Sequence, residues 1–470
     1  MNIQSNYSLS WRKRVIQMLL AGAGFTALVF AAACGGGSSS GGGGNPPPPA
    51  TSKTQVRIGD APVDRVIAFE VTMGSPITLT PSTGSNVTVT VGANRLELSH
   101  TAGNTEPLSV VNAPQGTYTS ATIIIKNPEV VYLDNAGVKH QFPSSTVADQ
   151  TVTVNFSPAL TIGATAQVLS IDLNVANSLT FDGSGAVTGF NFSGASFTFG
   201  AKAVAGEAEQ EDDSGELEDV TGLVTAATAN SFTMTVGQSG ASLTFNTDAN
   251  TQFSDGVTDA LSTLNQIVKV EGATQTDGSL LAKEVEGIEN QNGAEVEGII
   301  SAVTGNPASS LTILAQDGIG SGMDGTKVGT SFTVDVSGAS YKVSKGHVDL
   351  GGTNLTFDAV TVHAGQRVEV ESTGSVASGS ITADKVKLQQ QALTGTVTAT
   401  ASGSFTMTIP ADAAFAILSG GGTPSVSVIV PTKADNRFGT IAVGNTVRVR
   451  GLVFNSAGTF TMVARRITTP

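Results

Sequence analysis

The chain has one cysteine, Cys34, and one tryptophan, Trp11, in 470 residues, and only 13% of its residues are charged. If Cys34 has the role argued below, no other thiol remains, so disulfides and thiolate metal sites are excluded. No H-E-x-x-H motif and no Walker loop is present. We therefore expect no enzyme, with no catalytic residue, cofactor or metal site, although a carboxylate pair of a glycosidase could escape detection among 38 acidic residues.

The N-terminus has the three parts of a secretory signal peptide. Residues 12–14 are basic, Val15–Phe30 is an apolar run broken by two glycines, and residues 31–33 are alanines. This order predicts a cleaved signal peptide over residues 1–33. The alternative is an uncleaved anchor, because an apolar stretch of this length just reaches across a bilayer.

Ala31-Ala32-Ala33-Cys34 resembles the lipobox of bacterial lipoproteins, with Ala31 at the position usually taken by leucine. The resemblance implies that Cys34 carries a diacylglyceryl group and an N-linked fatty acid such as palmitate, which anchor the chain to a membrane. Gly35 replaces the aspartate that retains enterobacterial lipoproteins in the inner membrane, which favours the outer membrane. Residues 34–54, rich in glycine, serine and proline, predict a disordered stalk of about 30 Å.

Serine, threonine, glycine and valine dominate the rest of the chain, and short runs that alternate apolar with polar residues recur between turn sequences. Thr151–Phe156 is one such run. A period of two over four to six residues indicates a half-buried strand. We therefore expect an all-β protein with a β-sandwich over residues 55–204, followed by three small β-barrel repeats.

The first unit opens on residues 56–64, which contain Asp60-Ala61-Pro62-Val63-Asp64. With Leu108–Val111 and residues 114–118, this stretch resembles an uncharacterised domain of bacterial lipoproteins that begins with a D-A-P-x-D element. The resemblance covers roughly residues 55 to 200 and implies no activity, because the family has none established. Asp60 and Asp64 could hold a cation together, but solvated turn carboxylates are commoner.

Eight acidic residues lie between Glu207 and Asp219. Such a block repels itself and buries little, so residues 205–219 are expected to form a solvated linker between domains. Calcium could condense on this acidic joint, but the D-x-D-x-D-G loop pattern is absent.

From Val220 the chain repeats one unit three times, and we place barrels at residues 220–290, 291–390 and 391–470. Three matching segments carry the repeat: the openings at 220–224, 296–300 and 393–397, the strands at 231–236 and 404–409, and the later strands at 267–272, 367–371 and 446–451. We expect Phe232, Met234 and Val236 to face inward, while Lys269, Glu369 and Arg448 face outward and blunt exposed edges. Lysines and other charges commonly protect strand edges in this way.

These copies are similar to a second uncharacterised domain of secreted bacterial proteins, recognised by a V-x-G opening and a G-x-x-V-x-V-x-G close. That domain is thought to be OB-like, so the resemblance implies an OB-like barrel for each copy. The second copy departs from the pattern, because residues 367–371 lack the final glycine.

The second copy also carries an insertion, residues 317–325, rich in glycine and aspartate. A mobile hairpin tip is favoured over a calcium loop, because the stretch is not repeated in tandem. His347 and His363 could form a metal pair with the aspartates between them, but isolated histidines at strand ends are commoner. His100 and His140 are likewise expected on the surface.

The two ends of the repeat region carry opposite charge. Residues 207–290 are strongly acidic, whereas residues 391–470 hold six basic residues against two acidic ones. We expect Arg448, Arg450, Arg465 and Arg466 to form a contact for a polyanion, such as envelope polysaccharide or the acidic joint of a neighbouring molecule. The alternative is two differently solvated faces.

Taken together, the sequence predicts a lipoprotein of the cell envelope with a non-catalytic binding or scaffolding role. Its partners would be the membrane, through the lipid on Cys34, and an envelope polysaccharide or protein; the formal charge of −14 argues against nucleic acid. The alternative is a secreted hydrolase or a carbohydrate-binding protein with no recognisable motif. The scarcity of tryptophan and tyrosine makes sugar-stacking platforms hard to build.

Overall fold

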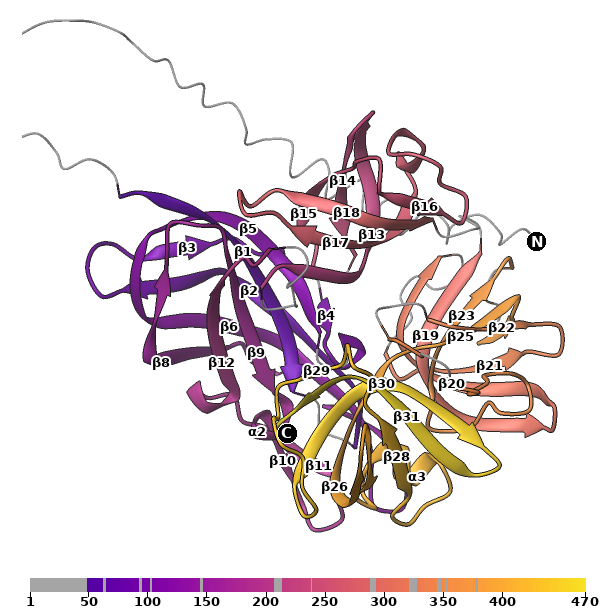
Figure 1. Cartoon of the computed structure of the whole chain (residues 1–470). Helices are drawn as coiled ribbons and strands as arrows, with labels where there is room; N and C mark the ends of the chain where they lie inside the picture. The colour runs from indigo at the N-terminus through magenta and orange to yellow at the C-terminus, as the bar shows by residue number, and fades with distance from the viewer. Residues whose placement is uncertain are drawn as a thin grey trace, which may run out of the picture.

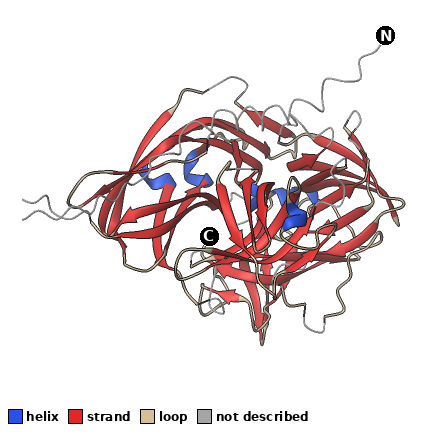
Figure 2. Cartoon of the chain, turned by 90° about the horizontal axis from the view of Figure 1, so that it is seen from above, coloured by secondary structure: helices blue, strands red, loops and turns tan. Residues whose placement is uncertain are grey.

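The computed structural model describes residues 49–61, 65–92, 95–101, 104–143, 147–206, 214–237, 239–287, 293–320, 328–344, 348–350, 353–374, 376 and 379–470. The expected signal peptide, Cys34 and most of the stalk lie outside the described residues. Nearly all of the described chain is strand, as expected from the sequence (Figures 1 and 2). Within this part of the chain, no helix is long and apolar enough to cross a membrane.

The first unit is a sandwich of two sheets. One sheet has the order β12-β9-β1-β5, with β1 and β9 parallel, and the other has the order β3-β2-β6-β7, with β4 paired to β2 and β8 to β6. In β8, Val152 and Val154 are buried while Thr151 and Thr153 are exposed, which confirms the alternation seen in the sequence. The elements are β1 (Thr51–Ala61), β2 (Val66–Pro81), β3 (Val87–Val89), β4 (Arg95–Glu97), η1 (Ser99–Thr101), β5 (Thr105–Pro114), β6 (Gly116–Leu133), β7 (Lys139–Phe142), β8 (Gln150–Ile162), β9 (Gln167–Asn174), α2 (Val175–Ser178), β10 (Leu179–Phe181), β11 (Val187–Phe190), η2 (Gly194–Ser196) and β12 (Phe197–Ala203).

The first and third barrels are closed and share one strand order. In the first, β15-β14-β13-β17-β18 closes through a parallel pairing of β18 with β15; in the third, β28-β27-β26-β30-β31 closes through β31 and β28. Phe232, Met234 and Val236 face the interior, as predicted. The first barrel comprises β13 (Glu216–Thr228), β14 (Ser231–Val236), β15 (Ser242–Asn246), β16 (Gln252–Ser254), η4 (Leu261–Thr263), β17 (Ile267–Thr274) and β18 (Leu280–Gly287). The third comprises β26 (Gln391–Ala401), β27 (Ser404–Thr408), α3 (Ala414–Leu418), β28 (Ser425–Ile429), β29 (Asp435–Asn436), β30 (Thr446–Ser456) and β31 (Thr459–Thr468).

The second barrel closes differently, because its last strand is divided. Its sheet has the order β22-β25-β23-β19-β20-β21-β24, so β24 and β25 lie at or near opposite edges and the chain joins them through Ala383 and Asp384. The Ala383 amide donates to the Asp335 carbonyl and the Asp384 amide to the Glu371 carbonyl. The strands are β19 (Ala294–Gly305), β20 (Ala308–Gly320), β21 (Ser331–Asp335), β22 (Ser340–Val343), β23 (Arg367–Ser372), β24 (Ser380–Thr382) and β25 (Lys385–Leu388).

One expectation for this barrel is corrected. Residues 317–320, assigned from the sequence to a hairpin tip, continue β20 and pair with residues 294–297 of β19, which include the core residues Ala294 and Val296. The rest of the insertion lies outside the described residues.

The sandwich and the three barrels surround a common junction, with the barrels above, beside and below the centre in Figure 1. Part of the junction is apolar: Ile67 and Val131 of the sandwich pack with Leu314 of the second barrel and Ala414 of α3. The second and third barrels also share a core, since Leu452 and Phe454 belong to the second barrel's hydrophobic cluster. Beside these contacts the junction is charged.

Candidate functional site

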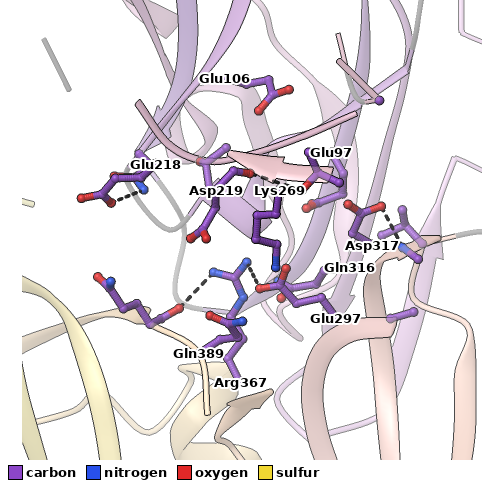
Figure 3. Close-up of a pocket in the computed structure, with 18 of the residues that line it drawn as sticks. Glu97, Glu106, Glu218, Asp219, Lys269, Glu297, Gln316, Asp317, Arg367 and Gln389 are labelled. Atoms are coloured by element: carbon purple, nitrogen blue, oxygen red, sulfur yellow. Dashed lines mark hydrogen bonds and ion pairs between the residues drawn. The ribbon is translucent and has the colours of Figure 1, made fainter. Parts of the chain in front are cut away.

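A cavity of about 260 Å³ lies where the sandwich and the three barrels meet. Figure 3 shows Lys269 of the first barrel and Arg367 of the second extending toward the centre, with Glu297 and Gln316 beside them. Among the described residues that line the cavity, eight carry carboxylates and four are cationic. The acidic residues are Glu70, Glu97, Glu106, Glu218, Asp219, Glu295, Glu297 and Asp317, and the cationic residues are Arg95, Lys269, Arg367 and Arg450. The site is therefore acidic overall.

Equivalent strand positions of the three barrels carry charged residues, and two of these residues, Lys269 and Arg450, line the cavity. The fourth and fifth strands of each barrel are antiparallel neighbours, so their outward side chains oppose one another in pairs. The paired residues are Lys269 with Glu286 and Glu271 with Glu284 in the first barrel, Glu369 with Lys387 and Glu371 with Lys385 in the second, and Arg448 with Thr468 and Arg450 with Arg466 in the third. The first barrel is thus acidic at these positions, the second balanced and the third basic.

Oppositely charged residues of different barrels form ion pairs with one another. Lys269 Nζ of the first barrel lies 2.6 Å from Glu369 Oε2 of the second, whose side chain is only 1% exposed. Glu218 of the first barrel pairs with Arg450 and Arg465 of the third at 3.0 and 3.2 Å. The Asn104 amide of the sandwich donates to the same Glu218 carboxylate at 2.7 Å. Glu218 therefore links three of the four units.

The carboxyl groups of the site fall into two electrostatic classes. Burial would raise the pKa of Glu218, but the Arg450 and Arg465 guanidinium groups outweigh burial and hold that pKa well below its usual range. The ammonium groups of Lys269 and Lys387 lower the pKa of Glu369 in the same way. By contrast, burial raises the pKa of Glu295 to about 8, since neighbouring Glu369 outweighs the opposing effect of Lys269.

Glu70 belongs to the second class, because burial raises its pKa to about 7 despite the contact with Arg95. Glu271 lies just outside the lining, and its pKa rises to about 8 through burial beside Asp219 and Glu218. At neutral pH the junction thus combines permanently ionised, paired carboxylates with others that hold a proton. A change of ligand or of pH at the site would act on the second class.

Two buried amide groups of the lining each keep an oxygen that accepts no hydrogen bond among the described residues. They are Asn104 Oδ1 and Gln316 Oε1, in side chains of residues that are 8% and 3% exposed. The Gln316 amide nitrogen donates to the Ile67 carbonyl at 2.6 Å. Because neither a carbonyl nor a carboxylate can donate, both amide orientations are fixed by their partners. The two oxygens remain available to a donor.

The four arginines expected to form a polyanion contact are not an open basic surface in the structure. Arg450, Arg465 and Arg466 are 5%, 8% and 6% exposed, and only Arg448 is half-buried. Arg465 pairs with Glu216 and Glu218, and Arg466 Nε lies 2.9 Å from Asp435 Oδ2. The expectation of an exposed contact is corrected, because the acidic partner lies within the same chain.

The predicted acidic linker is corrected in the same place. Its residues 207–213 lie outside the described residues, but strand β13 begins at Glu216, and Glu216 is 6% exposed. Arg57 of the sandwich donates to the Glu216 carbonyl. Lys269 and Glu369, expected to face solvent, are also buried by the neighbouring unit. Glu216, Lys269 and Glu369 are buried because the units pack against one another. The alternation of residues within a single strand does not reveal that packing.

The other candidate residues do not meet in a site. Among the described residues, no group of three or more His, Cys, Asp or Glu side chains is placed to hold a metal ion. His140 lies beside Asp134 at 2.8 Å and stacks on Tyr132, while His363 contacts the Ala364 carbonyl and Phe460. His347 and Asp64, and the side chains of Asp60 and His100, lie outside what the structure describes.

Sequence reasoning did not find Asn104, Gln316, Glu70 or Glu295. The amides lie in different units and have no shared motif. For Glu295 a signal exists, because it precedes the inward Val296 in the opening strand of the second copy and corresponds to Asp219 of the first. Acidic residues at the same outward position of two copies, Asp219 and Glu295, could have indicated that both face the same site, and both line the cavity.

The comparisons with known proteins concern the barrels. Residues 221–286, within the first barrel, match a family model described as a domain of unknown function (DUF5666). A search among curated proteins finds no relative of the chain.

Two solved structures are similar in part. One is titled "drosophila Unr CSD456", with 10% identity over 55% of this chain and 98% of that chain and a TM-score of 0.13. The other is a deletion mutant of the single-stranded DNA binding protein from Thermus aquaticus, with 13% identity over 38% of this chain and 94% of that chain and a TM-score of 0.14. TM-scores this low do not indicate a shared fold.

Proposed function

We propose that the protein is a lipid-anchored cell-envelope protein with a non-catalytic binding role, and that it holds its ligand in the central cavity. The observation that carries the proposal is the meeting of all four β units at one cavity whose lining includes buried polar groups without partners. A scaffold that only connected modules would gain nothing from such groups, because a buried unpaired polar atom costs about 1–3 kcal/mol. A ligand that pairs with them would offset this cost.

We also propose that the three barrels are copies of one OB-like domain and that the sandwich belongs to the D-A-P-x-D family. The shared strand order of the first and third barrels supports the first part. The divided strand β24–β25 in the second copy is consistent with its departure from the repeat pattern at residues 367–371.

For the anchor, we propose that lipid on Cys34 holds the protein at the outer membrane, with residues 35–54 as a stalk. The test is membrane fractionation of cells that express the natural chain or the Cys34→Ala variant, with metabolic labelling by a palmitate analogue. The natural chain should be labelled and membrane-bound. The variant should be unlabelled and should appear as soluble or unprocessed protein. A processed variant that remains in the membrane fraction contradicts lipid anchoring.

A hydrolase is the second candidate, and one observation favours it. Glu70, with a pKa raised to about 7, could serve as a general acid near ionised carboxylates of the same cavity. The test is turnover of chromogenic glycosides and esters by the full chain and by Glu70→Gln. Turnover that disappears in Glu70→Gln would replace the binding proposal with a catalytic one.

A further inference from the structure

We propose that the first barrel is an electrostatic lid on the central cavity, which leaves the junction as a folded body when the ionic strength rises. The inference rests on the proposed binding role, because it states how access to that cavity is controlled. Three observations carry it: the apolar contacts that join the other units, the charged contacts that the first barrel makes, and the share of the cavity lining that this barrel supplies.

Apolar packing joins the sandwich, the second barrel and the third barrel to one another. Ile67 of the sandwich, Leu314 of the second barrel and Ala414 of the third belong to one buried cluster. The core of the second barrel also includes Leu452 and Phe454 of the third. Because the burial of apolar surface is favourable without any charge, added salt does not screen it. These three units should therefore stay together at high ionic strength.

The first barrel shares no apolar cluster with its neighbours among the described residues. Its own buried cluster contains residues between 217 and 285, and the clusters of the other units contain none of these. Its apolar side chains thus fill its own interior, as the inward face of each strand does in a closed barrel. The barrel can therefore keep its fold when its contacts with the other units are lost.

Ion pairs and hydrogen bonds attach the first barrel to all three neighbouring units. The contacts are Glu216 with Arg465 and Glu218 with Arg450, both at 3.0 Å, Lys269 with Glu369 at 2.6 Å, Glu286 with Lys387 at 3.5 Å, Glu218 with Asn104 at 2.7 Å, and Thr274 with Gln55 at 2.9 Å. Most of them join opposite charges, so the attachment is mainly electrostatic.

Contacts of this kind weaken when salt is added. A buried ion pair has lost the hydration of both charges, and this cost offsets much of the attraction between them. When the barrel leaves, the charges regain water and attract counter-ions, and their range of interaction shortens from about 8 Å at 0.15 M salt to about 3 Å at 1 M. Salt therefore favours the undocked state of the first barrel.

Undocking opens the cavity, because the first barrel supplies one side of it. Glu218, Asp219, Thr221, Gly237 and Lys269 all belong to this barrel and line the cavity, and Lys269 extends toward its centre (Figure 3). The rest of the lining comes from the three units that stay joined. Departure of the first barrel would thus leave the other walls in place and expose the cavity to solvent.

Lys269 is a natural probe of this movement. Its side chain is 13% exposed, and its Nζ lies 2.6 Å from Glu369 Oε2 of the second barrel. Burial would lower the pKa of Lys269, but the carboxylates of Glu369 and Glu295 outweigh burial and hold that pKa well above its usual range. An amine reacts with an acylating reagent when it is neutral and accessible, so the docked Lys269 should react slowly. Lys126 of the sandwich, which is 40% exposed, is the reference.

The test is acetylation of the purified full chain by an N-hydroxysuccinimide ester at constant pH, in potassium chloride at about 0.15 M and about 1 M, with each lysine followed by mass spectrometry. Small-angle X-ray scattering measures the radius of gyration under the same conditions, and circular dichroism shows whether the strands persist. Glycine betaine at equal osmolality is the uncharged comparison solute.

Two variants complete the test. Glu218→Gln removes the charge that Arg450 and Arg465 share, with little change in shape. Asp412→Asn is the matched control, because it removes a carboxylate that pairs with Arg65 between the sandwich and the third barrel and does not attach the first barrel.

We expect the acetylation rate of Lys269, relative to Lys126, to rise at least about threefold in the higher salt, with a larger radius of gyration and an unchanged dichroism spectrum. Betaine should have no such effect. Glu218→Gln should show the rise already in the lower salt, because two arginines lose a partner charge, whereas Asp412→Asn should behave like the natural chain. The lid is wrong if salt leaves the Lys269 rate or the radius unchanged, if Glu218→Gln behaves like the natural chain, or if the rise accompanies loss of the strands.

The binding role can fail separately. If salt moves the first barrel but no uncharged, anionic or cationic compound of a thermal-shift panel stabilises the protein, the movement stands and the binding role is wrong. If a compound binds while the Lys269 rate and the radius of gyration stay constant in salt, the cavity is a binding site and the lid is wrong.

Discussion

The first and third barrels share one strand order but differ in charge at equivalent positions. Where Glu271 opposes Glu284 in the first barrel, Arg450 opposes Arg466 in the third. Like charges on neighbouring strands destabilise an isolated barrel. In the whole chain, Arg450 and Arg465 of the third barrel pair with Glu216 and Glu218 of the first, so the opposite charges of the two barrels favour contact between them.

The second barrel shows the opposite solution. There Glu371 and Lys385 face each other across the strands and form an ion pair at 2.7 Å. The charges of the second barrel balance at these positions, and its contact with the first barrel uses one buried pair, Lys269 with Glu369 at 2.6 Å. The comparison teaches that divergence in charge among copies of one fold can specify how they assemble, which is the best supported role of buried ion pairs.

The strongest way to break this arrangement is to remove Glu218. In Glu218→Leu, the buried Arg450 loses its carboxylate partner and Arg465 keeps only Glu216. An uncompensated buried charge costs about 3–5 kcal/mol, and we expect a loss of this size in the free energy of unfolding measured with urea. Asp149→Asn, which removes an exposed carboxylate paired with Lys126, is the control. A loss below about 1 kcal/mol would show that the arginines find other partners.

A change of pH sharpens the comparison, because the surplus acids of the first two barrels hold protons. The pKa values of Glu271 and Glu295 rise from 4.5 in the unfolded chain to about 8 in the folded one. Between these values the folded protein binds more protons, so the free energy of unfolding should fall as the pH rises, by up to about 1.4 kcal/mol per pH unit for each group. Above pH 8 the decline should level off.

Urea unfolding from pH 5.5 to 9 checks this slope. The double variant Glu271→Gln/Glu295→Gln should lose most of it, since glutamine does not ionise. A wild-type stability that rises with pH over this range would contradict the raised pKa values.

The smallest effect is expected at an exposed pair between the sandwich and the third barrel. Arg65 Nη2 lies 2.5 Å from Asp412 Oδ2, and the Asp412 side chain is 57% exposed. Solvent-exposed ion pairs contribute about 0–1 kcal/mol, so Asp412→Asn should change the free energy of unfolding by less than 1 kcal/mol and lose even that in high salt. A larger change in the free energy of unfolding would show that this pair stabilises the protein as much as a buried ion pair does, which would contradict the expectation.

The sequence predicted the elements well and the junction poorly. Alternation in Ser231–Val236 determines which side chains enter the barrel, because the interior of a closed barrel is filled by one face of each strand. The opposite charges of the first and third copies were also visible. Their meeting was not, because Glu218 and Arg450 are 232 residues apart and an acidic run in isolation looks solvated.

Asn104 and Gln316 mark the other limit of sequence reasoning. Nothing in a single amide side chain reveals that its oxygen will be buried without a partner. That property arises only when the sandwich and the second barrel pack together, with the Gln316 nitrogen on the Ile67 carbonyl.

A double-mutant cycle between Glu218 and Arg450 tests most directly whether charge complementarity joins the first barrel to the third. The free energies of unfolding of Glu218→Leu, Arg450→Met and the double variant are measured against the natural chain. We predict a coupling energy of about 2 kcal/mol, because the two side chains share one buried contact at 3.0 Å. Additivity within about 0.5 kcal/mol would contradict it, since independent sites behave in that way.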